Sequence, residues 1–391
     1  MEASRCRIYT TMSLMVMFGG GCIVVIKLLN SSLSEGEYFH HPFFLTLLLF
    51  IGEMCSFIVV WVKDWIDKRK YPLSRSSSES GAHESSENNP EALLIREKRL
   101  RTDYNPLVLA IPMLCDVTAT ILMIVSYINV QASVAQMIGS SIIFVVAIEA
   151  VFFLGKKLYR HHYLGATLVV IGLLLVALSA FLHESETVDG NTPLAIITAF
   201  LSSIMQGNQF ITEEKLLRTY HLRSFEVVAW EGLWGCILLV LILPALQYIP
   251  CSNSICNHGV VEDSLFALKQ IFSEPRMIIL CILVFFFICI YNGFGLAVTK
   301  MISSTNRVVV RQMKIVLIWI FFLVYPYEGG ESFKPLQLIG FIVLVIGVFL
   351  YNEVIVIHHL GFADHLDIRK DQEDNHSNEY VEFARNNSNS Q

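Results

Sequence analysis

Residues 164–172 read LGATLVVIG, and residues 339–347 read IGFIVLVIG. A shift of 175 residues without a gap relates the two stretches, and the same shift superposes three pairs of glycines. These pairs are Gly155 with Gly330, Gly165 with Gly340 and Gly172 with Gly347. Two apolar helices with glycines would also look alike by composition alone, but three glycines in register favour a true internal repeat.

The composition around this repeat is that of a membrane protein. Of the 391 residues, 54% are hydrophobic and only 16% are charged, and the mean hydropathy is +0.55. A soluble protein carries about 25% charged residues. A membrane-spanning helix needs ~20 mostly apolar residues. Ten such stretches occur, at residues 12–29, 43–62, 106–128, 132–154, 163–182, 193–211, 225–247, 277–298, 308–325 and 336–357. We therefore expect an all-α membrane protein with ten transmembrane helices.

Lysine and arginine lie almost entirely in alternate loops. Of 28 such residues, 22 fall on one side of the predicted membrane and 3 on the other. Basic loops are typical of the cytosolic side, so we expect both termini to be cytosolic. The net charge of −6 gives no indication of a nucleic-acid partner.

The repeat pairs the fourth and fifth predicted spans with the ninth and tenth, so each half contains five helices. Because five is an odd number, the second half must enter the membrane upside down. Inverted repeats of this kind are typical of secondary transporters, which bind their solute near the midplane between the halves. The predicted segments are two helices in 1–63, a loop in 64–104, three helices in 105–182, the second repeat in 193–357 and a tail in 358–391. The polar loop and tail should be disordered.

Three short motifs outside the spans suggest a modification or a contact. Cys251 and Cys256 lie in the longest predicted lumenal loop, where an oxidising compartment permits a disulfide, and two free thiols are the alternative. Asn30 begins a glycosylation sequon, but it adjoins the first span, which leaves a glycan little clearance. Tyr380 and Phe383 have the spacing of a tyrosine-based sorting signal, which an adaptor would bind as an added strand.

Among the charged side chains inside predicted spans, five cluster in depth, at Glu53, Asp116, Glu231, Arg311 and Lys314. A charge in the hydrocarbon costs at least ~2.5–3.5 kcal/mol, so such residues usually face a cavity or a partner. Arg311 and Lys314 share a helix face. We expect them to bind an anionic group or to form a gate with Glu231, while one of the carboxyl groups could carry a coupling proton. Alternatively, the five residues only pair with one another and fix the helix packing.

Uncharged polar side chains lie at a similar depth. Gln136 of the fourth span falls on Arg311 under the 175-residue shift. The predicted solute-binding residues are Arg311, Lys314, Gln136, Asn292, Tyr291 and Asn208. They would line a polar cavity together with spans two, three, four, seven, eight and nine. No cysteine and histidine spacing predicts a metal site, and no nucleophile with a base predicts an enzyme, so we expect neither a cofactor nor catalysis.

Short motifs in a fixed order add a family resemblance. They are LCDVTAT at 114–120, AS at 132–133, QM at 136–137, FLGKK at 153–157, EEK at 213–215, EGLWG at 231–235, VTK at 298–300 and IW at 318–319. In this order they resemble the drug/metabolite transporter superfamily, and more closely the F branch of solute carrier family 35. The resemblance implies ten helices in two inverted halves and an alternating-access carrier, with relatives that include nucleotide-sugar carriers and chloroquine-resistance-type carriers of acidic vacuoles. One departure is that close relatives carry an arginine after the Gln-Met pair, where this chain has Ile138-Gly139-Ser140.

Three functions compete on these grounds. The leading hypothesis is a secondary carrier of a small, anionic organic solute in an endomembrane, with a lysosome or late endosome favoured over the Golgi. The second is a proton-coupled exporter of cations or amino acids from an acidic organelle. The third is a membrane scaffold that transports nothing. The expected partners are a small solute, the lipid bilayer and a sorting adaptor at the tail.

Overall fold

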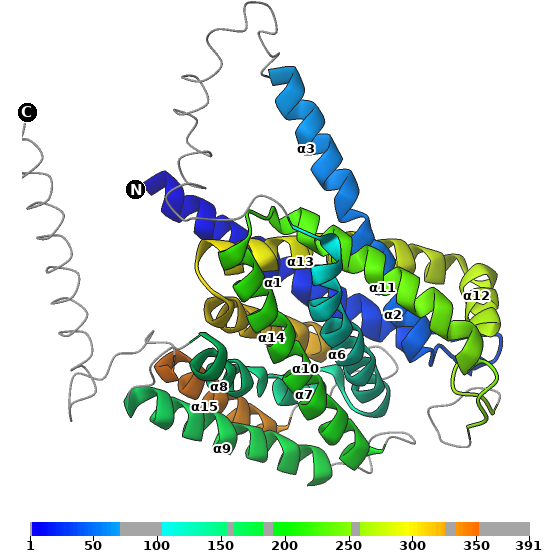
Figure 1. Ribbon diagram of the computed structural model, residues 1–391. Helices are drawn as coiled ribbons and strands as arrows, with labels where there is room; N and C mark the ends of the chain where they lie inside the picture. Colours follow the sequence, from blue (N-terminus) through cyan, green and yellow to red (C-terminus); the bar gives the residue numbers. More distant parts are fainter. Residues whose placement is uncertain are drawn as a thin grey trace, which may run out of the picture.

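The computed structural model describes residues 2–70, 104–154, 160–182, 191–251, 259–324 and 334–351. Within these ranges the chain folds into a helical bundle with one short hairpin (Figure 1). The elements are α1 (Glu2–Asn30), β1 (Leu33–Ser34), β2 (Glu37–Tyr38), α2 (Pro42–Met54), α3 (Ser56–Lys70), the 3-10 helix η1 (Pro106–Leu109), α6 (Ala110–Asn129), α7 (Ala132–Gly139), α8 (Ile142–Leu154), α9 (Arg160–Leu182), α10 (Thr192–Thr219), α11 (Ser224–Leu246), α12 (Ser264–Ser273), α13 (Pro275–Met301), α14 (Ser304–Val324) and α15 (Pro335–Tyr351).

Eight helical segments in the described ranges are long and apolar enough to cross a membrane. They account for the first eight predicted spans, and α14 and α15 occupy the positions of the ninth and tenth. α14 carries Arg307, Arg311 and Lys314 within its 21 residues, and α15 has 17 described residues. The multi-pass helical membrane fold is therefore confirmed, whereas the count of ten stays a prediction for these last two helices.

Two predicted spans are each divided into two helices. The second span breaks at Cys55, between α2 and α3. The fourth breaks at Ser140 and Ser141, where the backbone N–H groups bond to carbonyls three residues earlier, at 3.1 and 3.0 Å. These tighter turns keep the backbone groups satisfied. A break at membrane depth is tolerated where the helix is buried in protein or lines a cavity.

The predicted disordered loop begins later than the sequence indicated. α3 continues to Lys70, so residues 64–70 are helical, and α3 projects beyond the bundle (Figure 1). Nothing in this stretch breaks a helix, and basic residues at its end favour the negative end of the helix dipole. Arg223 also holds Asp64 in an ion pair of 2.6 Å. Residues 71–103 and the tail from 352 lie outside the described residues.

A small cap covers the predicted lumenal end. The β1–β2 hairpin turns at Glu35 and Gly36, which both have positive φ, as a two-residue hairpin turn requires. The hairpin packs on α12, where Ser34 Oγ donates to the carbonyl of Gln270 at 3.0 Å. The sequence reading did not predict α12, because its ten residues are too few for a span. Its N-cap Asp263 accepts a bond from the backbone of Phe266.

The packing of α9 against α15 follows the repeat (Figure 1). A Cβ on Gly165 would lie 2.8 Å from the carbonyl of Gly347, and a Cβ on Gly172 would lie 2.8 Å from the carbonyl of Gly340. The 175-residue shift converts the first contact into the second with the helices exchanged. The two helices therefore run antiparallel about a local two-fold axis, and only glycine permits this close backbone approach.

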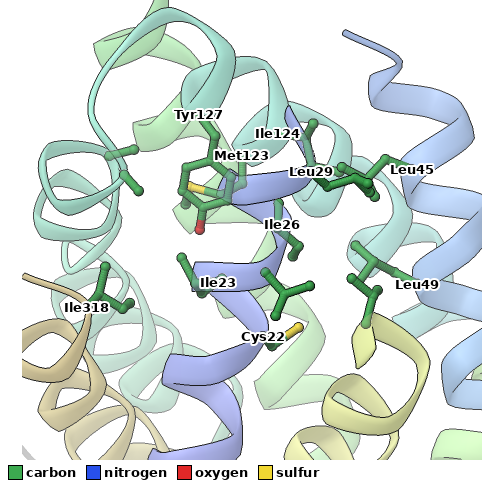
Figure 2. Packing of buried hydrophobic residues seen from close by; sticks show 14 of the residues in the cluster. Cys22, Ile23, Ile26, Leu29, Leu45, Leu49, Met123, Ile124, Tyr127 and Ile318 are labelled. Carbon is green, nitrogen blue, oxygen red and sulfur yellow. The ribbon is translucent and has the colours of Figure 1, made fainter. Parts of the chain in front are cut away.

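Other helix pairs also occur twice, once with each half supplying the first helix. α1 packs on α13, and its counterpart α10 packs on α6, the counterpart of α13. Similarly, α1 contacts α14 while α10 contacts α8. Ile23, Ile26 and Leu29 of α1 share one hydrophobic cluster with Leu45 and Leu49 of α2, and Leu29 lies beside Leu45 (Figure 2). The fold is thus built of two inverted halves, in which α1 packs on α13 and α14 of the second half and α10 packs on α6 and α8 of the first.

Candidate solute-binding cavity

A cavity lies at the centre of the bundle, between the two halves. The volume in which the centre of a water molecule fits is about 80 Å³. One water needs roughly 10–15 Å³ on this measure, so the cavity holds several waters or a small organic group. Its walls come from α1, α2, α6, α7, α10, α13 and α14. The polar and charged residues among its walls include Glu53, Asp116, Gln136, Gln206, Gln209, Tyr291, Asn292, Arg307, Arg311 and Lys314.

One wall carries three cations on a single face of α14. Arg307, Arg311 and Lys314 are spaced by four and three residues, so their side chains point the same way. All three are buried. Arg307 forms an ion pair with Glu213 of α10. Its guanidinium also lies 4.0 Å from the centre of the Phe210 ring, which favours a cation.

Arg311 and Lys314 have uncharged partners instead. Arg311 donates a hydrogen bond to the amide oxygen of Gln206. Lys314 Nζ lies 3.3 Å from the hydroxyl of Tyr291 and 4.8 Å from the centre of its ring. In the part of the chain that the structure describes, no carboxylate forms an ion pair with either residue. Two positive charges therefore face the cavity without a carboxylate in direct contact.

Two carboxyl groups face the same cavity from α2 and α6. Glu53 is 3% exposed and accepts a hydrogen bond from Asn292 Nδ2 at 2.5 Å, and its second oxygen has no hydrogen-bond partner within the described ranges. Asp116 is 5% exposed and accepts a bond of 3.3 Å from the hydroxyl of Thr120. Neither group pairs with a cation among the described side chains.

The remaining predicted residues lie in different places. Gln136 lines the cavity and donates to the hydroxyl of Tyr127. Asn208 does not line it, because its side chain turns back to the carbonyl of Ile204 at 3.0 Å. Glu231 is buried on α11 and does not line the cavity either, so the expected gate between it and Arg311 or Lys314 is not formed in this conformation.

The partner of Arg307 is not among the predicted site residues. Glu213 lies beyond the predicted end of the sixth span, but it is 2% exposed and holds Arg307. α10 continues to Thr219, well past the predicted end of the sixth span at 211, so Glu213 lies within the helix. Arg307 lies one turn before Arg311 on the same face, and this spacing was the available signal.

Different contacts hold the helix junctions toward the two predicted membrane faces. At the predicted lumenal end, Lys27 of α1 donates to the carbonyls of Tyr127 and Val130, at 2.7 and 3.1 Å, where α6 joins α7. At the predicted cytosolic end, Glu214 of α10 accepts bonds from the backbone and hydroxyl of Ser304, where α13 joins α14. The 175-residue shift places the first junction, at residues 130–131, within three residues of the second, at 302–303. In each half, the first helix thus bonds to the junction between the third and fourth spans of that half.

The other predicted sites are only partly described. Cys251 is the last described residue before a gap, and Cys256 lies outside the described residues, so their pairing stays a prediction. Tyr380 and Phe383 also lie outside them. Asn30 ends α1 and is only 3% exposed, so a glycan would require this end of the helix to open.

Apolar helices in two inverted halves around a central polar cavity define a multi-pass membrane transporter of small solutes. The chain belongs to the Triose-phosphate Transporter family, whose family model matches residues 24–352. This is a family of transporters and not of enzymes.

Individual relatives agree with this assignment. The chain is 29% identical over 322 residues to Solute carrier family 35 member F6 of Homo sapiens, which covers 82% of this chain and 80% of that protein. It is 27% identical over 310 residues to an uncharacterized protein of Schizosaccharomyces pombe, covering 79% and 86%. A stretch of 129 residues is 22% identical to the chloroquine resistance transporter of Toxoplasma gondii, covering 33% and 14%. The predicted resemblance to the F branch of solute carrier family 35 is confirmed.

Proposed function

We propose that this protein is a secondary carrier that moves a small organic solute with an anionic group across an endomembrane by alternating access. The observation that supports this most is the position of Arg311 and Lys314. Both face the central cavity, and no carboxylate of the described chain pairs with them. A charge near the middle of a membrane is costly without a partner, so a site that keeps two of them is suited to an incoming anion.

The arrangement of the two halves supports the alternating-access part of the proposal. The cavity lies between inverted halves, as in other carriers built from inverted repeats. Lys27 and Glu214 each form hydrogen bonds with a helix junction, one toward each end of the bundle. The ion pair between Arg307 and Glu213 joins α14 to α10. Such contacts can break and re-form as one half rocks against the other.

A reconstitution experiment tests the proposal. The purified full chain is placed in liposomes loaded with one anionic metabolite at a time, and efflux is measured against protein-free liposomes. Arg311→Gln should abolish efflux while the melting temperature changes little. Arg276→Gln is the matched control, because Arg276 is exposed at the start of α13 and far along the helix from the cavity residues. A broad panel with no efflux from the wild-type protein would contradict the proposal.

The second candidate function is proton-coupled export of cations or amino acids from an acidic organelle. The observation in its favour is that Glu53 and Asp116 line the same cavity without a cationic partner in the described ranges. Efflux that is independent of a pH gradient would exclude it. The scaffold alternative expects a centre closed by apolar packing, and the polar cavity does not favour it.

The predicted sidedness and location belong to the same proposal. The basic loops support a topology with both termini in the cytosol. Epitope tags at the two termini should therefore be accessible after selective permeabilisation of the plasma membrane. A lysosome or late endosome is favoured over the Golgi, and Tyr380→Ala should then move the protein away from markers of those compartments.

A further inference from the structure

The cavity carries charges of both signs on separate walls. Arg311 and Lys314 come from α14, whereas Glu53 and Asp116 come from α2 and α6. Opposite charges in a poorly solvated site attract strongly. Even so, the ion pairs of the described chain include none between these two walls. The cations of α14 and the carboxyl groups of α2 and α6 therefore do not pair with each other.

Two adjacent residues of α13 keep the charges separate. Tyr291 faces Lys314 through its hydroxyl at 3.3 Å, and Asn292 donates to Glu53 at 2.5 Å. Consecutive residues on a helix point about 100° apart, so α13 directs one neutral partner to each wall. Tyr291 is fixed on its other side by Gly19 of α1, where a Cβ would lie 2.6 Å from the Tyr291 ring. The separation is thus part of the packing of α1, α13 and α14.

Apolar side chains line the cavity as well. Ile23 and Ile26 of α1, Leu49 of α2, Met123 of α6 and Ile288 of α13 line it. A purely anionic solute would compensate the α14 wall and leave two buried carboxyl groups beside a negative charge. A purely cationic solute would create the opposite problem at Arg311 and Lys314. A molecule with one group of each sign compensates both walls at once.

We propose that the solute is a zwitterion of the amino-acid class, with its carboxylate on Arg311 and Lys314 and its ammonium group on Glu53 and Asp116. This inference rests on the proposed function and narrows its substrate class. Amino acids are also substrates in the second candidate function, and transport of leucine without a pH gradient distinguishes the two. The apolar lining would contact the side chain of the solute. The small cavity fits a single amino acid better than a long peptide.

Three probes that differ by one charge test the inference. L-Leucine carries both charges, N-acetyl-leucine keeps only the carboxylate, and leucinamide keeps only the ammonium group. In proteoliposomes of the full chain, leucine should move at least about tenfold faster than either analogue, because each analogue leaves one wall unpaired. Leucyl-leucine, with its charges further apart, should move more slowly than leucine.

Charge variants separate substrate contacts from structural roles. Glu53→Gln should lower leucine transport and raise the rate of N-acetyl-leucine relative to leucine. A structural defect would lower both rates together and leave their ratio unchanged. Glu274→Gln is the matched control, because Glu274 is exposed at the start of α13 and its side chain caps nothing there. An unchanged ratio in Glu53→Gln would overturn the assigned position of the ammonium group.

The possible outcomes distinguish this inference from the proposed function. If N-acetyl-leucine moves as fast as leucine, the zwitterion inference is wrong and an anion carrier remains. If leucinamide alone moves, both the inference and the anionic proposal are wrong. If none of these probes moves while another anionic metabolite does, the inference is wrong and the proposed function stands.

Discussion

Replacing Glu213 by glutamine removes one charge of a buried ion pair and leaves the other in place. The side chains of Arg307 and Glu213 are 3% and 1% exposed. Removing one partner of such a pair costs about 3–5 kcal/mol, because the remaining charge is buried without compensation. Gln209 Nε2 donates to Glu213 at 2.9 Å, and the oxygen of a glutamine can still accept this bond. We therefore expect the free energy of unfolding to fall by about 3 kcal/mol, at the lower end of that range.

A denaturant titration of the purified protein in micelles measures this change. Glu274→Gln is the control, and its effect should stay within about 0.5 kcal/mol because the residue is exposed. The double variant Glu213→Gln with Arg307→Gln should be more stable than Glu213→Gln alone, since it leaves no unpaired charge. A loss below about 1 kcal/mol in the single variant would show that water reaches Arg307, as at an exposed ion pair. A double variant less stable than the single one would refute the reasoning equally.

Three further predictions concern other parts of the molecule. Gly172→Leu should lower the melting temperature and separate α9 from α15, because its Cβ would lie 2.6 Å from the backbone nitrogen of Leu344. Lys27→Met should speed the labelling of Cys22, which lines the cavity, by an impermeant maleimide added from the predicted lumenal side, and an unchanged rate would contradict the role of Lys27. Lys269 bonds Glu35 and holds the pKa of its carboxyl below the usual value. This contact is therefore present above the usual pKa of about 4.3 and lost as the pH falls below it, so amide exchange in the hairpin should match at pH ~7 and ~5 and rise only below ~4.

Much of the fold follows from features that the sequence displays directly. Apolar length predicts the helices, and the glycine register predicts the antiparallel packing of Gly165 and Gly172 against Gly347 and Gly340. The break at Ser140 and the helix α12 were not predictable in the same way. Both depend on local hydrogen bonds rather than on hydropathy.

The sequence predicts which charged residues line the candidate site, but not which face of α10 is turned toward it. Arg311 and Lys314 line the cavity because their spacing places them on one face. Asn208 and Gln209 are adjacent, and only Gln209 reaches the cavity. Composition cannot distinguish two neighbouring amides. The rotation of α10 is set by its contacts with α6 and α8, which are distant in sequence.

If the protein works by alternating access, as we propose, the unlike contacts of Lys27 and Glu214 make its two end states energetically unequal. Lys27 binds backbone carbonyls at one end, whereas Glu214 binds the backbone and hydroxyl of Ser304 at the other. If the same kind of bond were made at both ends, two inverted halves would give inward-facing and outward-facing states of nearly equal free energy. Different bonds would instead give such a carrier a resting preference when it is empty, and a bound solute would have to supply enough differential affinity to overcome it. Substitutions at either end should therefore change which side the empty protein faces while leaving the walls of the cavity intact.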